Sequence, residues 1–109
     1  MAFDEALAGR IRKLMASREG LSERRMFGGL AFMLGGNMAC GVTSKDLMVR
    51  VGPGAYDDAL AQPHARPMDF TGRAMKGMVF VDPPGYATDE GLAAWVERGA
   101  AFAGSLPPK

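Results

Sequence analysis

The chain has 109 residues, of which 48% are hydrophobic and 23% charged, values typical of one globular domain and unlike those of a disordered segment. Thirteen basic against twelve acidic residues leave a formal charge of +1, which excludes the strong positive field that drives binding to a nucleic-acid backbone. The one cysteine, Cys40, excludes an intramolecular disulfide, and no segment resembles a signal peptide or a membrane span, so we expect a cytoplasmic protein without a membrane partner.

The first segment has the spacing of an amphipathic helix. Apolar residues recur at helical intervals, at Phe3, Leu7, Ile11, Leu14 and Met15. Acidic residues open the segment and basic residues close it, which complements the helix dipole, and Gly20 can end the helix. We predict a helix from about residue 3 to residue 18.

Three short apolar segments follow, at residues 30–34, 38–42 and 47–51. Compact polar or glycine-rich links of hairpin length join them, so they predict a three-stranded antiparallel meander. In the third segment apolar and more polar residues alternate, which predicts that Leu47, Val49 and Val51 face the core.

The second half begins with a short helix and a second hairpin. Residues 55–61 are long enough for about two helical turns, and Pro63 ends them. Residues 68–70 and 78–81 predict the two strands of the hairpin, and the proline-rich turn 83–85 stops it.

A last helix begins at Thr88 or Asp89, where both a capping side chain and early acidic residues are present. Its apolar stripe runs through Leu92, Trp95 and Val96, and the prolines after residue 106 cannot continue it.

These elements predict one domain over residues 1–109, in the order α-β-β-β-α-β-β-α. Hairpins without β-α-β alternation favour an α+β two-layer sandwich with a five-stranded, mainly antiparallel sheet whose helices cover one face. Residues 30–34 and 78–81 are apolar on both sides, so the second face needs another cover, and this motivates the hypothesis of a homodimer.

Four segments resemble, in the same order, the N-terminal domain of the TfoX/Sxy competence regulators. Residues 24–30, Arg-Arg-Met-Phe-Gly-Gly-Leu, look like the signature that opens the sheet in that family. Residues 47–53, with Tyr56 after them, are similar to its third strand and the exit from it. Residues 72–77 with 79–83 resemble its second hairpin, and residues 95–98 its last helix.

The resemblance implies the same α+β fold and a regulatory role. In that family the role is to promote transcription of competence genes together with a cyclic-AMP receptor protein. The regulators carry a C-terminal helical domain beyond the point where this chain stops, so we expect it to keep only the protein-contacting part. The family supplies no established catalytic residues.

Gly28 and Gly29, with Arg24 and Arg25 nearby, could present backbone N–H groups to an anion. A nucleotide-binding loop follows a strand and opens a helix, whereas here a helix precedes and a strand follows. A close backbone approach or a bulge at the strand entry is the favoured interpretation.

Arg73 and Lys76 occupy a predicted hairpin tip between two glycines, where they could grip a phosphate or an acidic partner. An ordinary solvated turn is the favoured interpretation, and convergence of Arg25, Arg50 and Lys76 in space would change it.

His64 and Cys40 complete the search for reactive groups. A lone histidine without ligand-spaced neighbours cannot form a typical metal site, and Cys40 within a predicted strand is expected to be a buried small hydrophobe. Nine methionines favour core filling, with an adaptable protein-contacting surface as the alternative.

We therefore expect a non-enzymatic regulatory or protein-interaction domain, without cofactor or metal, whose partner is a protein such as a transcription regulator. A small-molecule or anion-binding domain that uses the basic loops at one end of the sheet is the alternative, and direct DNA binding through the first helix is a third hypothesis. The candidate interaction residues are Arg24, Arg25, Phe27, Gly28, Gly29, Arg50, Arg73, Lys76 and Gly77.

Overall fold

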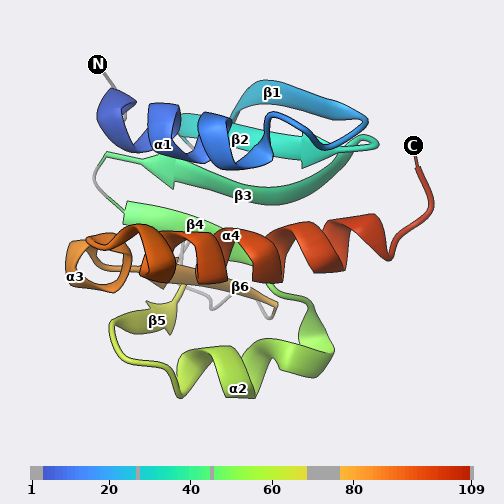
Figure 1. Ribbon diagram of the computed structural model, residues 1–109. Coiled ribbons are helices and arrows are strands. Elements are labelled where there is room, and N and C mark those ends of the chain that lie inside the picture. Colours follow the sequence, from blue (N-terminus) through green and yellow to red (C-terminus); the bar gives the residue numbers. More distant parts are fainter. Residues whose placement is uncertain (1–3, 27, 45, 69–76, 109) are drawn as a thin grey trace.

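A computed structural model describes residues 4–26, 28–44, 46–68 and 77–108, and it has an α+β fold (Figure 1). The elements in chain order are α1 (Glu5–Met15), β1 (Leu21–Met26), β2 (Gly29–Leu34), β3 (Asn37–Thr43), β4 (Asp46–Arg50), η1 (Pro53–Ala55), α2 (Tyr56–Leu60), β5 (Ala65–Pro67), β6 (Met78–Val81), α3 (Pro83–Tyr86) and α4 (Asp89–Gly104).

The sheet has six antiparallel strands in the order β1-β2-β3-β4-β6-β5, so the predicted number of five is wrong. The strand that the sequence did not predict is β1, whose residues Leu-Ser-Glu-Arg-Arg-Met lack a clear alternation of apolar and polar side chains. It forms because it pairs along its whole length with the apolar strand β2, from Leu21 opposite Leu34 to Met26 opposite Gly29.

The second hairpin is present, but one of its strands was misplaced. β6 matches the predicted residues 78–81, whereas its partner β5 covers Ala65–Pro67 and not residues 68–70, of which 69 and 70 lie outside the described residues. A proline such as Pro67 normally disfavours a strand, because it has no backbone N–H to donate. β5 is the last strand of the sheet and has a neighbour on one side only, so this position tolerates the proline.

The first two helices form with shorter bounds than predicted, and α1 ends at Met15, before the predicted stop at Gly20. Asp4 caps α1 by accepting hydrogen bonds from the backbone N–H groups of Ala6 and Leu7, at 3.0 and 3.1 Å. Thr88, one of the two predicted caps, accepts a bond from the N–H of Gly91 at 3.0 Å. The turn 83–85 that was predicted only to stop the hairpin forms α3, because prolines suit the first turn of a helix. Within the described ranges, no helix combines the length and apolarity that crossing a bilayer requires.

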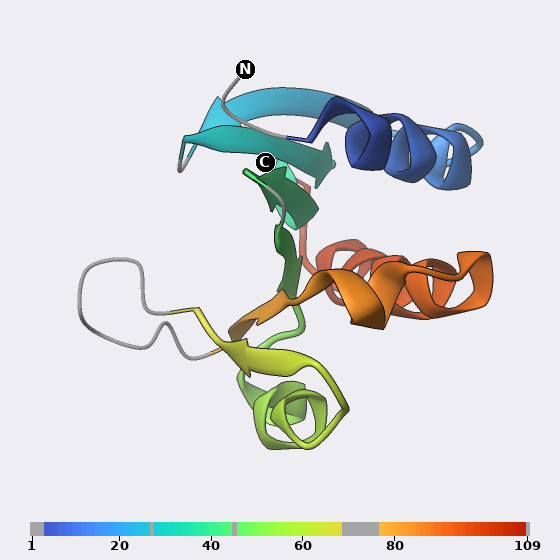
Figure 2. The same cartoon turned by 90° about the vertical axis from the view of Figure 1, so that its left-hand side faces the viewer.

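The main core lies between the sheet and the helices α1 and α4, which cover the same face (Figure 2). Leu47, Val49 and Val51 point into this core, as their alternation predicted. Gly99 of α4 packs directly on β3, because an added Cβ would lie 2.2 Å from the carbonyl oxygen of Ala39. Ala39 is the residue left without a partner at the β-bulge between β2 and β3.

The opposite face of the sheet carries a buried cluster of five methionines and one alanine. Its members are Ala31, Met33, Met38, Met48, Met68 and Met78, with Phe80 packed against them. All six are buried within a single chain, with at most 7% of their surface exposed, which favours the interpretation of these methionines as core residues. Burial of this face therefore does not call for a second copy.

Candidate functional site

The helices α1 and α4 lie side by side on one face of the molecule, and two ion pairs join them (Figure 1). Arg10 contacts Asp89 at 3.4 Å, and Arg18, in the turn after α1, pairs with Glu97. The two acidic residues are eight positions apart on α4, which is about 12 Å along the helix. We call the surface between the two ion pairs, from Arg10 and Asp89 to Arg18 and Glu97, the α1–α4 furrow.

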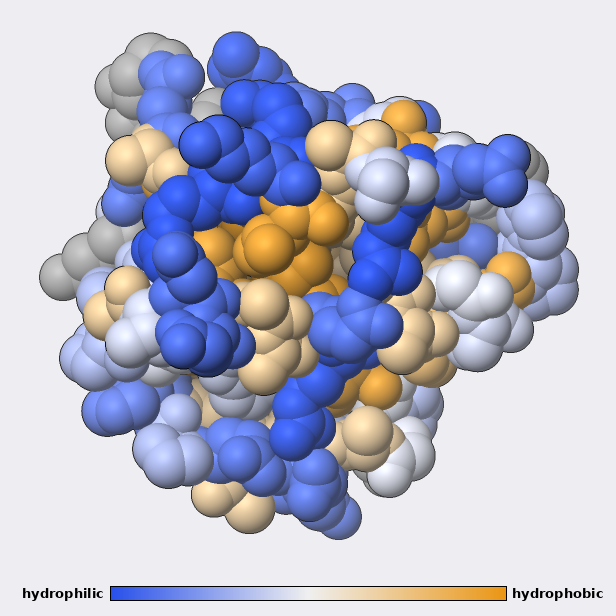
Figure 3. All heavy atoms as spheres, viewed as in Figure 1, coloured by the Kyte–Doolittle hydropathy of each residue, from blue (hydrophilic) through white to orange (hydrophobic). Residues whose placement is uncertain are grey.

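The floor of the furrow is apolar. Figure 3 shows hydrophobic side chains in the gap between α1 and α4, with hydrophilic residues along both sides. Leu14 of α1 is 40% exposed there, more than any other large hydrophobic residue in the described part of the chain. A hollow of about 310 Å³ is lined by Leu14 and Leu92, with Arg10, Lys13 and Asp89 around it.

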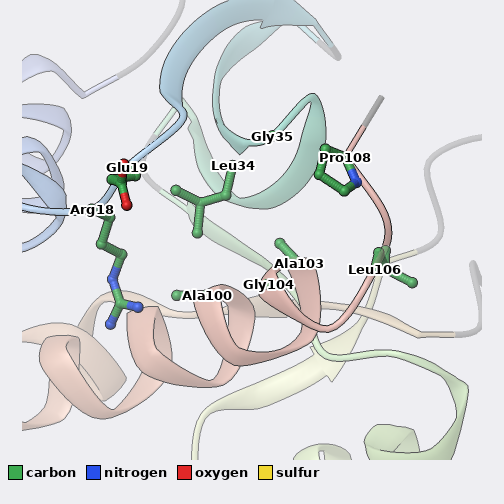
Figure 4. Close-up of a pocket in the computed structure, with 9 residues that line it drawn as sticks. All are labelled: Arg18, Glu19, Leu34, Gly35, Ala100, Ala103, Gly104, Leu106 and Pro108. Atoms are coloured by element: carbon green, nitrogen blue, oxygen red, sulfur yellow. The ribbon is translucent and has the colours of Figure 1, made fainter.

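A second hollow, of about 360 Å³, lies at the other end of the furrow (Figure 4). Its apolar lining comes from the end of β2, the end of α4 and the C-terminal tail, at Leu34, Ala100, Ala103, Leu106 and Pro108. The tail is held by Asn37, whose Nδ2 donates to the carbonyl oxygen of Pro107 at 2.9 Å. The side chain of Arg18 extends along this hollow toward α4, and Glu19 also lines it, so the apolar residues have charged neighbours on one side.

Arg24 and Arg25 lie on the edge strand β1 and are exposed. Arg24 is opposite Ala31 and Arg25 opposite Leu30, so their side chains belong to opposite faces of the sheet. Neither makes an ion pair with another described residue. Phe27, Arg73 and Lys76, three further predicted site residues, lie outside the described residues.

Backbone geometry accounts for the glycine pair at the entry of β2. Gly28 has a φ of 73°, a conformation that favours glycine. A Cβ on Gly29 would lie 2.0 Å from the carbonyl oxygen of Val42, so no side chain fits between β2 and β3 at this point.

Convergence of Arg25, Arg50 and Lys76 would have favoured an anion site, but Arg25 and Arg50, the two that the structure describes, lie apart. Arg25 lies at the end of the sheet where Leu30 pairs with Val42. Its strand, β1, is three strands away from β4, so the two strands are about 14 Å apart. Arg50 lies at the other end of β4, with its guanidinium carbon 5.2 Å from the centre of the Phe102 ring. Gly77 is at this second end too, where its carbonyl oxygen accepts from the N–H groups of residues 51 and 52 at 2.8 and 3.1 Å.

Cys40 and His64 do not form a reactive pair. Cys40 is fully buried, with its Sγ 3.8 Å from Sδ of Met15, and burial raises the pKa of the thiol to about 12. His64 is exposed in the loop before β5 and has a φ of 70°. Among the residues that the structure describes, no three His, Cys, Asp or Glu side chains are grouped as a metal site requires.

The furrow is the feature that sequence reasoning missed, although a signal for it is present. Arg10, Leu14 and Arg18 are each four residues apart, so they lie along one stripe of a helix. The prediction places Leu14 in the buried stripe, because the spacing of apolar residues alone does not separate a buried position from an exposed one beside it. The stripe becomes a surface only because α4 lies beside α1 and supplies the two carboxylates.

Comparison with known proteins identifies a family for this chain. Searches of curated proteins and of solved structures gave no match. Residues 13–103 match the model of the TfoX N-terminal domain, a span that includes every strand of the sheet and nearly all of α4. The chain therefore belongs to the TfoX N-terminal domain family.

Proposed function

We propose that this chain is a non-enzymatic, protein-interacting domain of transcription regulation, and that the α1–α4 furrow is its contact surface. The observation that carries the proposal is the exposed Leu14 on an apolar floor between two ion pairs. The family supports the choice of partner, because competence regulators with this domain act together with a cyclic-AMP receptor protein.

The furrow has the composition of a protein interface. Such interfaces combine an apolar centre with a polar rim, and here two apolar hollows lie along a line of charged residues. The side chains of Asp89 and Glu97 are 97% and 62% exposed, and ion pairs of this kind contribute little to stability. A partner can therefore rearrange both pairs at small energetic cost.

The test is direct binding of the purified chain to the cyclic-AMP receptor protein of the same organism, with and without cyclic AMP, measured by sedimentation velocity. We expect a complex that Leu14→Glu weakens by about tenfold or more, because the variant places a charge on the apolar floor. Ala61→Glu, which adds the same charge at an exposed residue next to α2, is the matched control and should bind like the wild type.

Absence of a complex, or equal weakening by both variants, would contradict the proposal. The same measurement reports self-association, so it also tests the expected homodimer. The alternative of an anion site receives no comparable support, since Arg25 and Arg50 lie apart. DNA binding through the first helix is disfavoured because Arg12 and Arg18 are already paired with Glu23 and Glu97.

A further inference from the structure

In the part of the chain that the structure describes, the outer edge of β1 is an open end of the sheet. β1 is the first strand in the sheet order and pairs with β2 on one side. In an antiparallel ladder every second residue turns its N–H and C=O groups away from its neighbour, so a strand of this length presents a row of unpaired donors and acceptors. Residues 22–25 of β1 are exposed.

The opposite edge of the sheet, formed by β5, is less accessible to an additional strand than the edge formed by β1. β5 has three residues, ends in Pro67 and has α2 packed against it. A short strand with a proline and a covering helix is a typical way to block further pairing. β1 has six residues and contains no proline.

The side chains of β1 give this open edge a positive charge. Glu23 is neutralised within the chain, because Arg12 donates two hydrogen bonds to its carboxylate at 2.6 and 2.8 Å. Arg24 and Arg25 remain without an ion pair among the described residues, and they flank the edge on its two faces. An incoming strand would therefore meet one guanidinium above the sheet and one below it.

These charges oppose pairing with a second copy. A two-fold axis that joins two antiparallel β1 strands edge to edge stands perpendicular to the sheet and passes midway between one residue and its own copy. An axis at Glu23, Arg24 or Arg25 places two like charges directly opposite each other, which is destabilising. An axis at Arg24 also sets Glu23 opposite Arg25, but that carboxylate already accepts two hydrogen bonds from Arg12. Pairing of two copies centred on these three residues is thus disfavoured, whereas a strand of opposite charge meets no such repulsion.

We propose that the outer edge of β1 binds an extended acidic segment of another protein as a seventh strand, with backbone hydrogen bonds along β1 and carboxylates against Arg24 and Arg25. Two adjacent acidic residues fit best, because successive side chains of a strand point to opposite faces. The inference concerns a surface separate from the α1–α4 furrow, so failure of the furrow experiment leaves it standing.

The experiment titrates the ¹⁵N-labelled full chain with a short capped peptide of threonine and valine that carries two adjacent glutamates at its centre. We expect shifts of the backbone amide signals of β1 and slower hydrogen exchange of those amides that face outward. Arg24→Glu and Arg25→Glu should each weaken binding by about tenfold, because each loses an ion pair and gains a like charge. Lys13→Glu, the same charge reversal on α1, is the matched control and should leave binding nearly unchanged.

Two further peptides separate strand addition from simple charge attraction. A peptide with glutamines in place of the glutamates should bind more weakly, and a peptide N-methylated at alternate residues should not bind, since it keeps the charges but cannot complete the ladder. The proposal fails if the N-methylated peptide binds equally well, if the acidic peptide causes no shifts at millimolar concentration, or if the shifts lie outside β1 and β2. Amide shifts of β1 that depend on protein concentration without peptide would assign the edge to a second copy and overturn it too.

Discussion

Replacement of Gly99 by alanine tests the contact that fixes α4 on the sheet. The added Cβ would lie 2.2 Å from the carbonyl oxygen of Ala39 and 2.9 Å from its carbonyl carbon. A relaxed contact between carbon and oxygen is about 3.3 Å or longer, so α4 has to move away from β3 by about 1 Å. Both obstructing atoms belong to the backbone of a central strand, and no side-chain rotation relieves the overlap.

The free energy of unfolding should fall by about 2 kcal/mol. Overpacking of a core costs about 1–3 kcal/mol, and the rigid backbone of β3 places Gly99→Ala at the upper end of that range. Alanine recovers up to about 1 kcal/mol, because it stabilises a helix interior relative to glycine. For a chain of 109 residues, the remaining loss corresponds to a melting temperature lower by about 8 °C.

Gly9→Ala is the matched control, because Gly9 lies inside α1 and an added Cβ would meet nothing within 4 Å. This variant should be more stable than the wild type by about 0.5–1 kcal/mol. Urea unfolding followed by circular dichroism measures both changes. If the two variants are equally stable, the contact between Gly99 and Ala39 is not the constraint described above.

Three further predictions concern single side chains. Cys40 should react with iodoacetamide at neutral pH only as fast as the chain opens, because burial raises its pKa to about 12; rapid alkylation of the native protein would contradict this. The hydrogen bond from Arg12 lowers the pKa of Glu23, so this pair stabilises the fold above about pH 4.5 and is lost as the pH falls through the lowered pKa. As the pH is lowered into this range, Glu23→Gln should therefore lose less stability than the wild type, by a difference below about 1 kcal/mol in urea unfolding. An equal loss in the two proteins would refute this. Asn37→Ala should cost about 1 kcal/mol and speed amide exchange in the tail, since the bond to Pro107 is lost; unchanged exchange would show that Asn37 does not hold the tail.

The elements that the sequence predicted well are those whose pattern reports their own burial. The meander β2-β3-β4 is apolar and bounded by glycine or polar links, so its strands were found to within one or two residues. The cap of α4 at Thr88 followed from side-chain chemistry that acts over three residues. Local physics suffices for features of this kind.

The elements that were missed depend on neighbours distant in the chain. β1 carries charged residues and becomes a strand because β2 offers it a partner along its whole length. β5 contains a proline that only an edge position tolerates, and its place at the edge is set by the sheet order. The burial of the second sheet face also depends on the tertiary structure. Its apolar pattern predicted that another chain covers it, but its methionines are buried within one chain.

The amino-acid sequence by itself determined the α+β class, the central meander, the capped helices and the membership of the family, because spacing, capping and motif order are properties of short segments. Only the tertiary structure decided that Leu14 is exposed on a furrow between two ion pairs, and that Arg24 and Arg25 flank the open edge of the sheet. The furrow is built from α1 and α4, which are far apart in the chain. The open edge exists because β1 is the first strand in the order of the whole sheet. Whether a side chain there is buried, paired or free depends on what lies beside it in space.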